Sequence, residues 1–195
     1  MGAAAAAVVV VLDQVTKLLA ERGLEPGERV DVLGYLFGLR LYYNPGAAFS
    51  LGTSATPLLT VFATAASVAM VVALVRTTRP AWGLAVGVLL GGALGNLTDR
   101  LLRPPGFARG EVVDFFQLPS FPIFNVADVG VVTGAALVVL LSLRDVPFRD
   151  GEGSGDGEGA GDGDGAADRG GAHVQDGSGD ADGPSVEPST APREP

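Results

Sequence analysis

The sequence predicts an all-α membrane protein with four transmembrane helices, short strands outside them and a disordered C-terminal tail. Its composition is the first indication, because 47% of the 195 residues are hydrophobic and the mean hydropathy is +0.35. The second indication is that the apolar residues gather in four segments: 3–20, 57–75, 81–98 and 126–143. Each segment is near the ~20 residues that a helix needs to cross ~30 Å of hydrocarbon.

The four segments are not equally apolar. Residues 3–20, AAAAAVVVVLDQVTKLLA, are interrupted by Asp13 and Lys17. They lack the basic start and the small-residue cleavage site of a signal peptide, so we expect a retained span. Residues 57–75 contain no charge, and residues 81–98 contain GGALG, which is typical of membrane helices that pack closely.

The connectors between the segments have different characters. Residues 21–56 mix Val, Leu, Tyr and Phe with glycines, which favours short strands with turns. Their aromatic residues suit the membrane–water interface. The second connector, RTTRP, is very short, and the third, about 99–125, is rich in charged residues.

The tail has a composition of its own. Residues 151–195 hold half of the 22 acidic residues but only two of the 13 basic residues, which accounts for the whole net charge of −9. A Gly-rich segment with few apolar side chains cannot bury enough surface to fold. The sequence therefore predicts a membrane domain over 1–150 and a disordered tail over 151–195. The GDGDG run lacks the ligand spacing of an EF-hand, so we expect no calcium site.

Several chemistries are excluded by residue type. The chain has no cysteine, and its single histidine, His173, lies in the tail. Disulfides, a cysteine nucleophile, a histidine-based triad and a zinc site are therefore excluded. We expect no metal and no cofactor.

Polar residues gather at one end of the predicted bundle. With four spans, the first and third connectors lie on the same side of the membrane. Charges within spans are costly and usually mark function, so we expect these side chains to converge at one interface. The residues at this end are Asp13, Lys17, Asn44, Asn96, Asp99, Arg100, Asp114, Asn125 and Asp128.

Two acids among apolar neighbours indicate an aspartic hydrolase. Asp114 stands in VVDFF and Asp128 in FNVAD. Two close carboxyl groups cannot easily both ionise, so one proton is shared and the ionised group activates water. A Ser50–Lys17 dyad is an alternative, but Asp13, one helical turn from Lys17, favours a charged lysine that cannot act as a base. Asp13 and Lys17 alone can equally be a structural ion pair.

Charge alone leaves the orientation open. Arg76, Arg79, Arg144 and Arg149 favour a cytoplasmic location for the end that holds the second connector. The opposite end, however, carries arginines as well.

Five blocks in order carry a resemblance to a known family: DQVTK at 13–17, NPGAAFS at 44–50, GNLTDR at 95–100, VVDFF at 112–116 and FNVAD at 124–128. The sequence resembles the bacterial lipoprotein signal peptidases, or type II signal peptidases. It departs from the family in PPGFAR at 104–109, which reads as an inserted surface loop, and in the tail.

The resemblance implies a membrane aspartic endopeptidase that removes the signal peptide of diacylglyceryl-modified prolipoproteins, cutting before the lipidated cysteine. It implies that Asp114 and Asp128 are the catalytic pair. It assigns substrate binding or support of the pair to Asn44, Asn96, Arg100, Asn125, Asp13, Lys17 and Asp99. It also implies a small β-cradle and an active site at the extracytoplasmic face of the bacterial cytoplasmic membrane, with cytoplasmic termini.

The family resemblance also implies which molecules the protein contacts. We expect lipidated prolipoproteins and membrane lipid as partners, no nucleic acid, and a monomer. The rival classes are a small transporter or a proton or ion channel that uses the intramembrane acids, and a scaffold whose acids only join helices. Transport is disfavoured because the charges crowd one end of the bundle and no internal repeat is evident.

Overall fold

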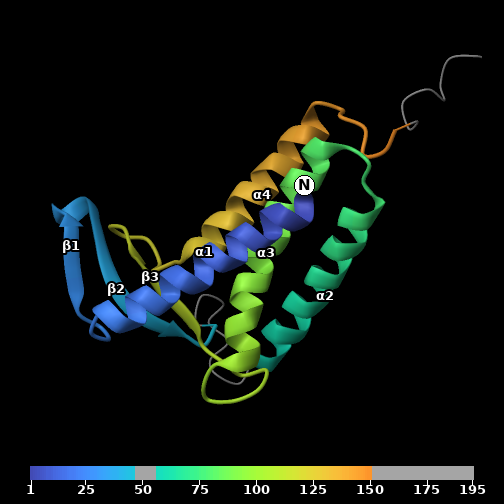
Figure 1. Cartoon of the computed structure of the whole chain (residues 1–195). Coiled ribbons are helices and arrows are strands. Elements are labelled where there is room, and N and C mark those ends of the chain that lie inside the picture. Colours follow the sequence, from blue (N-terminus) through green and yellow to red (C-terminus); the bar gives the residue numbers. More distant parts are fainter. Residues whose placement is uncertain (47–55, 151–195) are drawn as a thin grey trace, which may run out of the picture. The chain divides into compact units, whose positions relative to one another are not determined.

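The fold is four long helices with a small sheet at one end (Figure 1). The computed structural model describes residues 1–46 and 56–150. Ser50 and the tail 151–195 lie outside the described residues. The elements are α1 (Gly2–Gly23), β1 (Arg29–Leu33), a 3₁₀ turn (Gly34–Leu36), β2 (Phe37–Asn44), α2 (Thr56–Arg76), α3 (Pro80–Leu102), β3 (Val112–Gln117) and α4 (Val126–Leu143).

All four predicted spans are confirmed as helices that are long and apolar enough to cross a membrane. Two of them extend further than the apolar segments that predict them, because α1 ends at Gly23 and α3 at Leu102. The last turn of α3 therefore carries Asp99 and Arg100 of the predicted interface. Asp13, Lys17 and Asp99 are held on helices rather than on loops.

Close packing of α3 depends on its glycines. A Cβ at Gly87 would lie 2.2 Å from the carbonyl oxygen of Gly2 in α1, and a Cβ at Gly92 would lie 2.3 Å from that of Ala127 in α4. Helix axes this close leave no room for any side chain at these positions. This confirms the close packing that GGALG predicts, and α3 packs against both α1 and α4.

The three strands form an antiparallel sheet in the order β1-β2-β3. β2 pairs with β3 in a register that sets Tyr42 opposite Asp114. The strands of the first connector were predicted, but β3 was not, although the Val- and Phe-rich VVDFF run is typical of a strand. A small core of Ala20, Leu41, Val113 and Phe115 joins the sheet to the end of α1.

The opposite end of the bundle is closed by the segment that follows α4. The hydroxyl of Thr77 donates to the carbonyl of Phe148 at 2.9 Å, and Trp82 Nε1 donates to the carbonyl of Val146 at 3.0 Å. The ring of Trp82 meets that of Phe148 edge to face, with centroids 5.3 Å apart. The short α2–α3 connector and the end of the membrane domain thus lie together, away from the sheet.

The inserted loop at 104–109 is folded against the last turn of α3. Gly110 N–H, just after the loop, donates to the carbonyl of Arg100 at 3.0 Å, and a Cβ at Gly110 would lie 2.1 Å from the carbonyl oxygen of Asp99. The buried hydroxyl of Thr60 in α2 donates to the carbonyl of Ala108 at 2.9 Å. The loop therefore joins α2 to the end of α3 that carries Asp99 and Arg100.

Candidate active site

Asp114 lies on β3 with its carboxylate turned toward amide donors. Asp114 is buried, with only 2% of the residue exposed. Asn44 Nδ2, from the end of β2, donates to one oxygen at 2.9 Å, and Asn125 Nδ2 donates to the other at 2.6 Å. Both oxygens of this buried carboxyl group thus have a partner, as a buried polar group requires. The chain reaches Asn125 because Phe124 returns to pair with Phe116 of β3.

Asp128 is fixed by the N-terminus of α4. Asn125 is the N-cap, and its side-chain oxygen accepts the N–H of Asp128 at 3.0 Å. The Asp128 carboxylate accepts the N–H of Asn125 at 3.1 Å in return. This is a reciprocal capping box, which satisfies two backbone donors that the helix leaves without partners. It also sets the Asn125 amide so that its nitrogen faces Asp114.

Asn96 of α3 connects the two carboxyl groups. Its Nδ2 donates to Asp128 at 2.8 Å, and its Oδ1 accepts from Asn125 Nδ2 at 3.1 Å. The Oδ1 also accepts from Lys17 Nζ at 3.0 Å. Since an ammonium group can only donate, Lys17 determines which end of the Asn96 amide faces Asp128. Asp114 and Asp128 are therefore joined through two amides, Asn125 and Asn96.

Lys17 lies at the centre of a buried ion cluster. Its Nζ is 2.8 Å from Asp13 and 2.7 Å from Asp99, and all three side chains are fully buried. With Asn96 as a third acceptor, the three donors of the ammonium group are all used. A Ser–Lys dyad would need this nitrogen free to take a proton, so the geometry disfavours that alternative.

The same cluster holds the backbone beside each candidate catalytic residue. Asp13 accepts the N–H of Ala127, one residue before Asp128, at 2.9 Å. Asp99 accepts the N–H of Val113, one residue before Asp114, at 3.3 Å. The cluster thus connects α1 and α3 to the first turn of α4 and to β3.

Sequence reasoning missed three members of this network. Gln14 Nε2 donates to Asp13, to Asp99 and to the carbonyl of Gly95, at 3.1 to 3.2 Å. Arg103 pairs with Asp99 at 2.7 Å and with Glu21 at the end of α1. Gln14 is part of the DQVTK block, so its position in the motif was an available signal. Nothing local distinguishes Arg103 or Glu21 from surface residues.

The proton affinity of Asp114 is high. Burial raises the pKa of its carboxyl group to about 7, the donor from Asn44 opposes this rise, and the negative charge of Asp128 adds to it. A carboxyl group that keeps its proton until near neutral pH suits general acid–base work.

Arg100, the remaining predicted residue, is within electrostatic reach of Asp99, Asp114 and Asp128. Its Nη1 is buried and has no hydrogen-bond partner among residues 1–46 and 56–150. The structure thus brings all nine predicted polar residues to one end of the bundle. Within the same described ranges, no three His, Cys, Asp or Glu side chains are grouped as a metal site.

Comparison with known proteins agrees with this geometry. The family model for signal peptidase (SPase) II matches residues 5–144. A lipoprotein signal peptidase of Rhodococcus jostii is 50% identical over 139 residues, which are 71% of this chain and 70% of that protein. One of Mycolicibacterium smegmatis is 49% identical over 143 residues, 73% of this chain and 61% of that protein.

Solved structures share the fold. A bacterial membrane enzyme determined by the in meso method at 1.9 Å resolution matches with a TM-score of 0.66 and 28% identity, covering 74% of this chain and 94% of that one. A second such enzyme matches with a TM-score of 0.63 and 27% identity, covering 82% and 94%. Nothing in these likenesses supports a transporter. The chain belongs to the signal peptidase II family of membrane peptidases.

Proposed function

We propose that this chain is an aspartic endopeptidase that removes the signal peptide from diacylglyceryl-modified prolipoproteins. The observation that carries the proposal is the connection of Asp114 to Asp128 through Asn125 and Asn96. Membership of the signal peptidase II family supports the substrate class.

The two carboxyl groups act as a pair that shares one proton. Asp114, whose pKa lies at about 7, lets the pair keep that proton near neutral pH. The ionised carboxylate takes a proton from water as the water attacks the scissile carbonyl carbon. The protonated partner donates a hydrogen bond to the carbonyl oxygen as negative charge develops there. The proton taken from water then passes to the amine nitrogen as the C–N bond breaks, which restores the starting state of the pair.

Arg100 and the amides bind the peptide. The buried Nη1 of Arg100, beside the carboxyl groups, is a donor for a peptide carbonyl in an extended substrate. Asn44 supplies an amide beside Asp114 from the end of β2. The lipid on the substrate cysteine stays in the bilayer, so the scissile bond lies at the interface, at the depth where the helix ends hold the pair.

The decisive experiment is cleavage of a lipidated prolipoprotein by Asp114→Asn and Asp128→Asn variants in membranes. Each substitution keeps the shape of the side chain and removes one proton site, so both variants should lose activity by at least about 10³-fold. Asp145→Asn, at an exposed residue after α4, is the matched control and should cut normally. Normal cleavage by either dyad variant, in folded protein, contradicts the proposal. Ser50→Ala tests the alternative nucleophile in the same assay.

We also propose that the sheet and the inserted loop at 104–109 lie on the outer side of the cytoplasmic membrane. The chain has no cysteine, so single reporter cysteines are simple to place. Gly106→Cys in the exposed loop should react with a membrane-impermeant maleimide in intact cells. Asp145→Cys, at the opposite end of the bundle, should react only after the membrane is opened. If Asp145→Cys reacts in intact cells and Gly106→Cys does not, the topology is the opposite of the one proposed.

A monomer is sufficient for this function. All of the residues assigned here to the pair and its support come from one chain. Activity in nanodiscs that each hold one protomer tests this. Chemical crosslinking verifies that each disc holds one copy, and cleavage activity should remain.

A further inference from the structure

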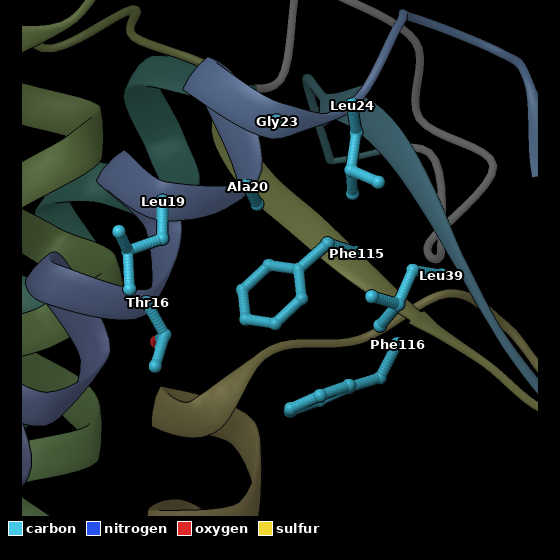
Figure 2. Close-up of a pocket in the computed structure, with 8 residues that line it drawn as sticks. All are labelled: Thr16, Leu19, Ala20, Gly23, Leu24, Leu39, Phe115 and Phe116. Atoms are coloured by element: carbon cyan, nitrogen blue, oxygen red, sulfur yellow. The ribbon is translucent and has the colours of Figure 1, made fainter. Parts of the chain in front are cut away.

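A cavity of about 380 Å³ lies between the end of α1 and the sheet. Four residues of α1 and Leu24, just after it, form one wall, and three residues of the sheet form the other (Figure 2). The lining residues are Thr16, Leu19, Ala20, Gly23, Leu24, Leu39, Phe115 and Phe116. The volume is within the range of small-ligand pockets.

The walls of this cavity are apolar. The one hydroxyl group, that of Thr16, shares its single donor between the backbone carbonyls of Leu12 and Asp13, at 2.7 and 2.9 Å, so no donor is left to face the cavity. The cavity is open along α1, where Leu19 is 61% exposed, and its walls do not offer the two to four polar partners that would hold an ordered water molecule. The occupant must therefore be apolar.

The cavity continues the face of α1 that meets the hydrocarbon. Val8, Leu12 and Leu19 are 57%, 51% and 61% exposed, and with Thr16 and Gly23 they follow helical spacing along one side of α1. From Thr16 to Leu24 the cavity runs along about 12 Å of helix, taking 1.5 Å per residue. Its length thus lies along the membrane-spanning axis, the direction in which an acyl chain extends.

The cavity is separate from the catalytic pair. Its lining includes neither Asp114 nor Asn44 and Asn125, the two amides that donate to the Asp114 carboxylate. We expect a substrate lipid attached next to the scissile bond to lie beside Asp114, which does not line the cavity. The chain in the cavity would therefore have another source.

We propose that this cavity binds one acyl chain of a bilayer phospholipid. The chain enters along the exposed face of α1, between Leu12 and Leu19, and ends against Phe115 and Phe116. It fills space that would otherwise leave these side chains without contacts on one side. Because Phe115 follows Asp114 directly, the bound lipid supports the strand that carries a catalytic residue.

Photolabelling tests this without any substrate, so its result is independent of the proposed peptidase function. The protein is placed in vesicles of phosphatidylethanolamine and phosphatidylglycerol that contain a phospholipid with a diazirine near the end of one acyl chain. Adducts are then mapped by mass spectrometry. We expect adducts on Leu39, Phe115 or Phe116, besides those on the exposed face of α1.

A filling variant supplies the contrast. A Cβ at Gly23 meets no heavy atom within 4 Å, so Gly23→Trp can place an indole in the cavity without a backbone clash. Labelling of the three sheet residues should fall at least about fivefold, while Val8 and Leu12 stay labelled. Leu18→Trp, on an exposed α1 residue that does not line the cavity, is the matched control and should change nothing. Gly23→Leu takes the place of Gly23→Trp if the Gly23→Trp variant does not fold.

Three results would overturn the proposal. One is the absence of adducts on the sheet residues in the unmodified protein. Another is unchanged labelling of those residues in a folded Gly23 variant. The third is labelling that occurs only when the diazirine is on the acyl chain of a prolipoprotein, since the cavity would then belong to the substrate.

Discussion

The carboxylate of Asp13 in α1 accepts the backbone N–H of Ala127 at 2.9 Å, one residue before Asp128 in α4. Asp99 makes the equivalent bond to Val113, one residue before Asp114. Each acid of the Lys17 cluster thus holds the backbone next to one member of the proposed pair. We propose that the cluster positions the pair through these bonds, so that it affects the reaction without touching the substrate.

Replacing the central cation should destabilise the whole bundle. Lys17→Met leaves Asp13 and Asp99 buried without their shared partner, and breaking a buried ion pair in this way costs about 3–5 kcal/mol. Thermal or denaturant unfolding in micelles measures the loss. Arg22→Met, at an exposed cation one turn further along α1, is the control and should change stability little. Equal stability of the two variants would contradict the assigned role of Lys17.

Removing the amide between the acids should slow the reaction more than it weakens binding. Asn96→Ala deletes the donor to Asp128 and should lower kcat about 10²-fold, with little change in KM. Steady-state kinetics with a lipidated peptide measures both constants. Thr98→Ala removes a hydroxyl that bonds only within α3 and serves as the control. A change confined to KM would make Asn96 a substrate contact instead.

Activity should fall on the alkaline side of neutrality. The pair needs one proton, and the pKa of Asp114 is about 7, so kcat/KM should decline as the pH rises through that value. The Asn44 donor lowers this pKa, so Asn44→Leu should move the alkaline limb to higher pH while reducing the rate. If the alkaline decline of kcat/KM occurs at the same pH in Asn44→Leu, the decline belongs to another group than Asp114.

Stability should depend on pH in the same range. The folded state raises the pKa of Asp114 from 3.8 to about 7, so the folded state binds a proton more tightly than the unfolded state. The contribution to the free energy of unfolding is complete below 3.8 and is lost as the pH rises to about 7. Asp114→Asn cannot ionise, so it should lose this part of the pH dependence in unfolding experiments.

The inserted loop and the residue just after it offer a pair of glycines for comparison. Gly110→Ala forces a Cβ to within 2.1 Å of the Asp99 carbonyl oxygen, so it should cost about 1–3 kcal/mol and lower activity by moving Asp99 and Arg100. Gly106→Ala, within the loop, meets no atom within 4 Å and should be neutral or slightly stabilising. Unfolding and cleavage assays of both variants test whether the loop is part of the site.

The acidic tail should be dispensable for catalysis. A chain that stops after Asp150 keeps the ion pair of that residue with Arg79, 2.8 Å long, and all the residues of the site. Its rate of prolipoprotein cleavage in membranes should equal that of the full chain. A loss of rate in correctly inserted protein would give residues 151–195 a role in the reaction.

The sequence alone determined the helices and the end at which the polar residues meet. Each span is long and apolar by itself, so no tertiary contact is needed to predict it. Successive connectors alternate between the two sides of the membrane, so the first and third connectors share a side, which predicted the convergence of Asp13, Asn96, Asp114 and Asp128. The family blocks added the roles of these residues.

Only the tertiary structure decided how the residues contact one another. β3 is stabilised by pairing with β2 and by a short core against α1, which are contacts between distant parts of the chain. The orientation of the Asn96 amide depends on Lys17, 79 positions away. Arg103 and Glu21 resemble surface charges until the ends of α3 and α1 bring them together. Hydrogen bonds act over about 3 Å, and sequence spacing does not determine which groups come that close across helices.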